Sequence, residues 1–201
     1  MTQQTSNPPS YHFAEWQEAH FRPVNKFYKQ QKHKGKANGD ERVFVIYRQG
    51  LGDSELDSNL ESNIVGAVRL VPMLVPMLVP MHTSAHEQAT TEEPTETLDS
   101  HNSDYYWLRS LYIDSHLRGQ QLGSKLLAYV RQNIASSPTN PTPKPTPMYC
   151  FPYEHLLHFY QQAGWQLCEL NALPQAIADL YTRYTQRGEK ILAMSQQIQT
   201  R

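Results

Sequence analysis

One stretch, residues 108–127, constrains the fold more than any other part of the chain: it runs LRSLYIDSHLRGQQLGSKLL. Residues 105–113 are rich in aromatic and aliphatic side chains, which predicts a strand. Over residues 122–134 apolar side chains recur at helical spacing, which predicts an amphipathic helix. A short turn with two glycines joins them. This succession indicates an α/β chain in which a helix starts close to the end of a strand.

The turn before this helix has the properties of an anion site. The first amides of a helix have no acceptor within the helix and lie at the positive end of its dipole. Gly119 and Gly123 would let a ligand approach the backbone, and Arg118 would add a charge that can bind a phosphate. The turn fits neither the GxxxxGK[ST] phosphate loop nor the GxGxxG dinucleotide motif. An ordinary helix start with a solvated arginine is the alternative.

The same turn resembles a known motif. It is similar to the donor-binding motif [QR]-x-x-G-x-[GA] of the GNAT superfamily of N-acetyltransferases, with Arg118 at the first position and Gly123 at the last. Gln121 stands where that motif usually has a glycine. The resemblance implies that the pyrophosphate of coenzyme A lies on the amides of the turn, and that the pantetheine arm pairs with the preceding strand. The cofactor-binding residues that it implies are Leu111, Tyr112, Ile113, Arg118, Gly119, Gln120, Gln121, Leu122, Gly123 and Ser124.

A second block supports this resemblance. The run FYQQAGW, from Phe159 to Trp165, is similar to the F-Y-x-x-x-G-[FW] pattern of the same superfamily. There the tyrosine lies near the thioester sulfur, so the resemblance implies that Tyr160 protonates the leaving thiolate. The alternative is that Tyr160 only packs its ring in the core. A basic N-terminal helix together with the YCFP run resembles a bacterial branch of the superfamily, which implies no further residue role.

An attacking amine must be neutral, so a proton acceptor is expected as well. Of Glu154, His155 and His158, we select His155 as the catalytic candidate because a histidine titrates near neutrality. A solvated helix face is the alternative for all three. Cys150 and Cys168 are the only cysteines and lack metal-ligand or disulfide spacing, so we expect no metal, and we interpret Cys150 as packing in a strand.

The chain of 201 residues predicts one domain over residues 11–195, preceded by a disordered start at 1–10. Flexible insertions are expected at about 72–104, where a Val-Pro-Met-Leu repeat begins, and at 137–147. The class is α/β, and the resemblance implies a GNAT-like mixed, mostly antiparallel central sheet with splayed strands flanked by helices. The expected strands are 11–16, 43–47, 64–71, 105–113, 148–151, 165–170 and 190–194, and the expected helices are 23–31, 122–134, 152–163 and 174–184.

Charge and hydropathy restrict the partners. The formal net charge is −1, so no overall field drives binding to nucleic acid. Residues 64–81 are apolar but carry prolines at every fourth position from 72, which excludes a membrane helix, and no signal peptide precedes them. We therefore expect a cytoplasmic protein that does not bind membranes. Residues 19–39 hold six basic side chains and no acidic one. A solvated helix face explains them better than a nucleic acid-linked acceptor.

The sequence thus predicts an N-acyltransferase that uses acetyl-CoA as cosubstrate and transfers the acyl group directly to a primary amine. The acceptor is a small molecule or a peptide, and a homodimer is left open. The alternative is a non-catalytic module that keeps the fold and binds acyl-CoA as a sensor or interaction partner.

Overall fold

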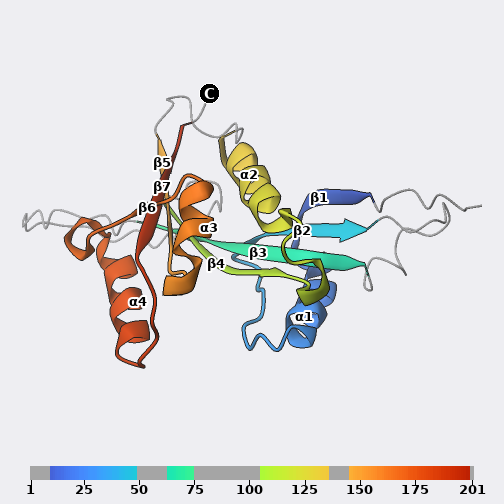
Figure 1. Cartoon of the computed structure of the whole chain (residues 1–201), viewed down its shortest axis with the longest axis horizontal. Coiled ribbons are helices and arrows are strands. Elements are labelled where there is room, and N and C mark those ends of the chain that lie inside the picture. The colour runs from blue at the N-terminus through green and yellow to red at the C-terminus, as the bar shows by residue number, and fades with distance from the viewer. Residues whose placement is uncertain (1–9, 49–62, 75–104, 136–144, 200–201) are drawn as a thin grey trace, which may run out of the picture.

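A computed structural model describes residues 10–48, 63–74, 105–135 and 145–199 of the chain. Its centre is a seven-stranded sheet in the order β1-β2-β3-β4-β5-β7-β6 (Figure 1). The strands are β1 (Tyr11–Trp16), β2 (Arg42–Arg48), β3 (Ile64–Met73), β4 (Tyr105–Ile113), β5 (Thr146–Cys150), β6 (Gln166–Leu167) and β7 (Met194–Ile198). The α-helices are α1 (Phe21–Gln30), α2 (Leu122–Ala135), α3 (Leu157–Gln162) and α4 (Gln175–Thr185). Single 3-10 turns are η1 (Glu18–His20), η3 (Ser115–Leu117), η4 (Glu154–Leu156) and η5 (Leu170–Ala172).

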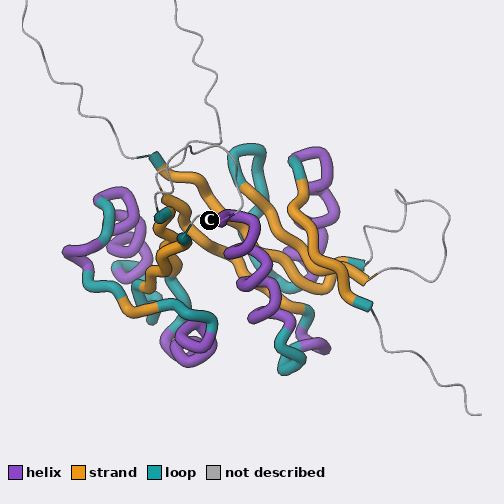
Figure 2. Tube along the Cα trace, turned by 90° about the horizontal axis from the view of Figure 1, so that it is seen from above, coloured by secondary structure: helices purple, strands orange, loops and turns teal. Residues whose placement is uncertain are grey.

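Helices cover both faces of the sheet (Figure 2). On one face α2 and α3 pack over the largest core cluster, in which Leu126 and Val130 of α2 meet Leu108 of β4. On the other face α1 packs over β2 and β3, and α4 packs over β4 and β5. The alternation of side chains along β4 explains the two layers, because successive residues point to opposite faces.

All pairings between neighbouring strands are antiparallel except the one between β4 and β5. This confirms the predicted class, a mixed and mostly antiparallel sheet flanked by helices. The strands expected at 43–47 and 64–71 form and pair with each other antiparallel, and the helices predicted near residues 23–31, 122–134 and 174–184 form within two residues of their expected bounds. Amphipathic spacing located them correctly because each helix buries one apolar stripe against the sheet.

The C-terminal strands differ from the prediction. The strand expected at 165–170 is only Gln166–Leu167, and the last strand is Met194–Ile198 rather than 190–194. The pattern failed here because β7 contains three consecutive polar residues although it lies between β5 and β6. One of them, Gln196, donates from Nε2 to the carbonyl of Ala163 at 3.0 Å, so its amide has a partner. The helix expected at 152–163 is divided into η4 and α3.

Two prolines lie inside strands where a loop was expected. Strand β3 continues to Met73, and Pro72 pairs with Tyr106 of β4. Because β2 pairs with β3 only as far as Leu70, none of the described strands lies on the other side of Pro72, and its missing N–H removes no ladder bond to them. Strand β5 likewise begins early and includes Pro147. The rest of the repeat, and most of the predicted insertions and disordered start, lie outside the described residues.

Candidate functional site

Strands β4 and β5 pair over only part of their length. The parallel pairing covers Tyr106 to Leu108 of β4 and ends at Cys150, the last residue of β5. Beyond Leu108, β4 continues to Ile113 and keeps its partner β3 on the other side. Among the described residues, the edge of β4 that faces β5 therefore has no strand partner over residues 109–113. An extended chain that contains amides can pair with such an edge.

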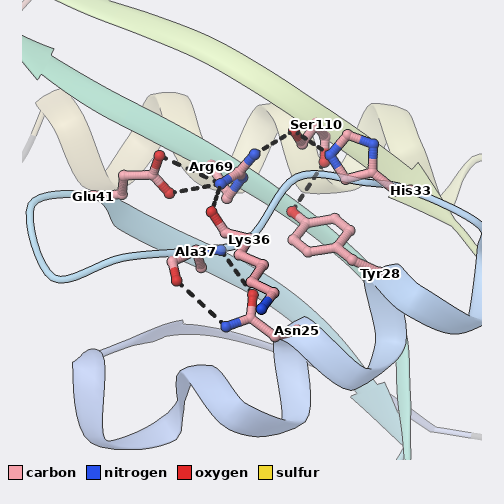
Figure 3. Close-up of polar contacts among 8 residues, drawn as sticks. All are labelled: Asn25, Tyr28, His33, Lys36, Ala37, Glu41, Arg69 and Ser110. Atoms are coloured by element: carbon pink, nitrogen blue, oxygen red, sulfur yellow. Dashed lines mark hydrogen bonds and ion pairs between the residues drawn. The ribbon is translucent and has the colours of Figure 1, made fainter.

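An irregularity in β4 lies at the start of this unpaired segment. The register with β3 shifts between Ala67 and Arg69, and Ser110 has a φ of 56°. A left-handed backbone is unfavourable for a serine, so surrounding contacts must hold it. The hydroxyl of Tyr28 donates to the Ser110 carbonyl at 3.0 Å, and Nη2 of Arg69 donates to Ser110 Oγ at 2.8 Å (Figure 3). These contacts keep β4 bent where β5 ends.

Arg69 is the centre of this polar network and is only 1% exposed. Its Nη1 lies 3.0 Å from Oε2 of the buried Glu41 and also donates to the carbonyl of Lys36. Ser110 Oγ lies 2.9 Å from Nε2 of His33. Because Arg69 can only donate, Ser110 Oγ accepts from it, which leaves the Ser110 hydroxyl proton available for Nε2 of His33. Burial and the charges of Arg69 and Arg109 lower the pKa of His33 to about 4, so this ring is neutral near pH 7. No sequence pattern indicated this network, because its members come from segments far apart in the chain.

The turn before α2 presents free amides to solvent. The first bond of the helix runs from Lys125 N to Gln121 O at 3.0 Å, and within the described part of the chain the amides of residues 119–124 have no protein acceptor. Gly119 has a φ of 81° and Gln121 a φ of 60°. Residues 118–121 are exposed. Gln121 thus occupies a left-handed position that suits the glycine of the motif, while its amide stays available.

Arg118 and the two glycines have different positions in this site. Nε of the exposed Arg118 donates to the carbonyl of Ile113 at 3.4 Å, so its charge lies at the end of β4. A Cβ at Gly119 would meet no atom within 4 Å, which leaves the turn accessible. A Cβ at Gly123 would lie 3.1 Å from the ring of Phe159. The absence of a side chain at Gly123 therefore allows α2 to pack closely against α3, and the role of Gly123 in binding a ligand stays a prediction.

A groove of about 260 Å³ continues from the start of α2 towards the end of α3. Its lining includes Ser124, Arg131 and Gly164. The groove begins at the last of the free amides, and the exposed guanidinium of Arg131 contributes a second positive charge to its wall. This surface can hold an anionic or nucleotide-like group next to the turn.

Tyr160 of α3 lies at the end of the β4–β5 pairing. Its ring is buried between Phe159 and Trp165, with centroid distances of 5.1 Å and 5.9 Å. Burial raises the pKa of its phenol well above the usual value, and the neighbouring Cys150 raises it further. The hydroxyl is therefore protonated near pH 7 and lies close to the residue at which β5 ends. The buried Cys150 thiol also has a raised pKa, as expected for a packing residue rather than a nucleophile.

The structure does not bring His155 together with Tyr160. His155 is exposed on η4, and its ring stacks on that of Tyr153 at 5.9 Å and 12°. Glu154 and His158 are exposed too. Leu111, Tyr112 and Ile113 lie on the unpaired part of β4, and Leu122 is buried under the turn. Within the described ranges no group of three histidine, cysteine or acidic side chains could hold a metal ion. None of the helices in those ranges has the length and apolar character to cross a membrane.

Comparison with known proteins gives likeness in structure only. No sequence-family model and no curated protein matches the chain. An acetyltransferase of the GNAT family from Staphylococcus aureus Mu50 aligns with a TM-score of 0.52 at 12% identity, over 94% of this chain and 99% of its own. A GNAT-family acetyltransferase from Streptococcus pneumoniae aligns with a TM-score of 0.52 at 10% identity, over 94% and 99%. Arabidopsis thaliana NAA60, solved in complex with acetyl-CoA, aligns with a TM-score of 0.52 at 10% identity, over 94% of this chain and 98% of its own.

These matches extend over nearly the whole of both chains. At identities of 10–12% they establish the architecture. The chain has the fold of the GNAT-family acetyltransferases.

Proposed function

We propose that the protein is an N-acyltransferase that transfers an acyl group from acyl-CoA, with acetyl-CoA as the expected donor, directly to a primary amine. The observation that carries this proposal is a single juxtaposition. The unpaired edge of β4, the free amides of residues 119–124 and the Tyr160 hydroxyl surround the point where β4 and β5 separate. The structural likeness to NAA60, which was crystallised in complex with acetyl-CoA, supports the choice of donor.

Each part of coenzyme A has a matching surface. The amides at the start of α2 and the guanidinium of Arg118 would bind the pyrophosphate, because both present positive charge at one place. The pantetheine arm contains two amides and would pair with residues 111–113 of β4 as a strand does. Gln121, Leu122 and Ser124 contribute backbone amides, and Gln120 is fixed by the Tyr11 hydroxyl at 3.5 Å. The thioester would then lie near Cys150 and Tyr160.

In the reaction the neutral amine attacks the thioester carbonyl and forms a tetrahedral intermediate. The new C–N bond remains, the C–S bond breaks, and the electron pair goes to sulfur. The Tyr160 hydroxyl donates its proton to that thiolate and is reprotonated from solvent, while the nitrogen loses its extra proton to water or to a base. The raised pKa of Tyr160 keeps its phenol protonated near pH 7, so the proton is present when the thiolate forms.

Calorimetry with acetyl-CoA, followed by thiol release over a panel of primary amines, tests the proposal. Tyr160→Phe should lower kcat by roughly 100-fold or more with the Kd for acetyl-CoA unchanged. Tyr129→Phe is the matched control and should keep full activity. Tyr129 lies on α2 and packs against the same core cluster as Tyr160, with its ring 6.2 Å from that of Phe44. No binding of acetyl-CoA in the micromolar range would refute the proposal. Binding without thiol release on any amine would favour a sensing module on the same fold.

A further inference from the structure

Arg109 is the first residue of β4 beyond the segment that pairs with β5. Its side chain lies on the face covered by α1 and α4, opposite the face of Tyr160, because Trp107 two residues earlier packs with α4. The ring of His33 contacts that of Tyr112 at 4.7 Å on the same side. An acceptor that reaches the point of strand separation from this side would therefore pass Arg109.

Arg109 has no ion-pair partner of its own among the described residues. Its cross-strand partner in the register is Arg69, and like charges in this position repel. Glu41 neutralises Arg69, whereas Arg109 makes no hydrogen bond or ion pair within residues 10–48, 63–74, 105–135 and 145–199. The Nε of Arg109 is buried without a partner. Burial and Arg69 together lower the pKa of this guanidinium.

The guanidinium is held in one orientation although it has no polar partner. Its Cζ lies 4.5 Å from the centre of the Trp107 ring. The Trp107 ring is itself fixed by Phe151 at 5.9 Å and Tyr184 at 6.2 Å. A guanidinium stacked on an indole keeps the N–H groups along its edges available, and these edges match the two oxygens of a carboxylate. A partly buried, rigid and unpaired arginine is costly for stability unless a ligand uses it.

We propose that Arg109 binds a carboxylate carried by the amine acceptor, so that the substrate class is amino acids or peptides with a free carboxylate near the reacting amine. This inference rests on the proposed acyltransferase function and adds the acceptor class. Arg109 acts as a specificity-determining residue that orients the acceptor beside the β4–β5 opening.

The experiment compares L-amino acids with their own carboxamides, and O-phosphoethanolamine with ethanolamine. The native protein should use each acid better than its amide by roughly 10- to 100-fold in kcat/KM, the range for losing one charge-assisted contact. Arg109→Met keeps the apolar contact with Trp107 and should abolish this preference while leaving the rate with the amide. Arg109→Lys keeps the positive charge but loses the paired N–H donors of the guanidinium, so it should retain part of the preference.

A binding readout separates this inference from the proposed function. In the presence of CoA, titration with the acid but not the amide should change the fluorescence of Trp107, and the change should be absent in Arg109→Met and in Trp107→Phe. If acetyl-CoA does not bind, the acyltransferase proposal fails while this titration still reports on the anion site. Equal use or binding of acids and amides, or a preference that survives in Arg109→Met, would overturn the inference. Stronger use of O-phosphoethanolamine than of any acid would overturn it in favour of a phosphate-bearing acceptor. A large loss of thermal stability in Arg109→Met would assign the arginine a structural role instead.

Discussion

The buried ion pair of Arg69 and Glu41 should dominate the stability of the N-terminal half of the sheet, and Glu41→Gln tests this. The two side chains are 1% and 5% exposed, and their charged atoms are 3.0 Å apart. At this distance, and with an effective dielectric constant of about 20, the attraction is about 5 kcal/mol. The substitution removes that attraction and leaves Arg69 charged next to its register neighbour Arg109.

Leaving one partner of a buried pair uncompensated costs about 3–5 kcal/mol. A domain of this size loses roughly 2–4 °C of melting temperature for each kcal/mol. Glu41→Gln should therefore lower Tm by about 6–20 °C in thermal unfolding followed by circular dichroism. Glu15→Gln is the matched control, since its pair with Arg42 is closer, at 2.6 Å, but the two side chains are 22–23% exposed. The control should lose about 1 kcal/mol or less.

The double variant Glu41→Gln/Arg69→Met distinguishes charge from packing. It removes both charges, so it should recover at least half of the stability lost in Glu41→Gln, even though Ser110 loses its donor. A loss below about 1 kcal/mol in Glu41→Gln, or no recovery in the double variant, would show that this ion pair does not carry the stability assigned to it.

Two further perturbations have defined outcomes. The first turn of α2 holds no acidic residue, so Ser124→Glu should stabilise the helix by about 0.3–1 kcal/mol through the helix dipole. The same substitution should weaken acetyl-CoA binding at least ~5-fold, because the new carboxylate repels the pyrophosphate. Urea unfolding measures the stability and calorimetry the affinity, with Ser124→Gln as the neutral control; an unchanged affinity would place the pyrophosphate elsewhere. The pKa of His33 is about 4 in the folded protein, against 6.5 in the unfolded chain. Between these two pH values the unfolded chain binds one more proton than the folded protein, so the free energy of unfolding should fall as pH drops from 6.5 to 4. The expected loss is about 1–2 kcal/mol, because the partly exposed ring is screened by solvent. His33→Gln should remove this component and His158→Gln, on an exposed position, should not; a pH dependence equal in His33→Gln and the native chain would contradict the neutral-ring assignment.

Local patterns predicted the parts of the molecule that depend on neighbours in the sequence. The strand, turn and helix over residues 105–135 were located correctly, because the free amides and the amphipathic stripe are properties of one continuous segment. The positive φ of Gly119 and Gln121 follows from the same short turn. In contrast, β7 lies a few residues after its expected position. Its polar residue Gln196 is stabilised by a hydrogen bond to the carbonyl of Ala163, a contact between distant segments that hydrophobic periodicity cannot predict.

The sequence by itself thus determined that a glycine-containing turn and a helix start follow a strand, and that Tyr160 lies a fixed number of residues after them. Only the tertiary structure decided what surrounds them. Glu41, Arg69 and Ser110 meet because Glu41 directly precedes β2, and the antiparallel strands β2, β3 and β4 lie side by side. Among the described residues Arg109 is left without an ion pair, because Glu41 pairs with its register neighbour Arg69. Such outcomes depend on which side chains the sheet register places together, and burial then makes each pairing, or its absence, energetically important.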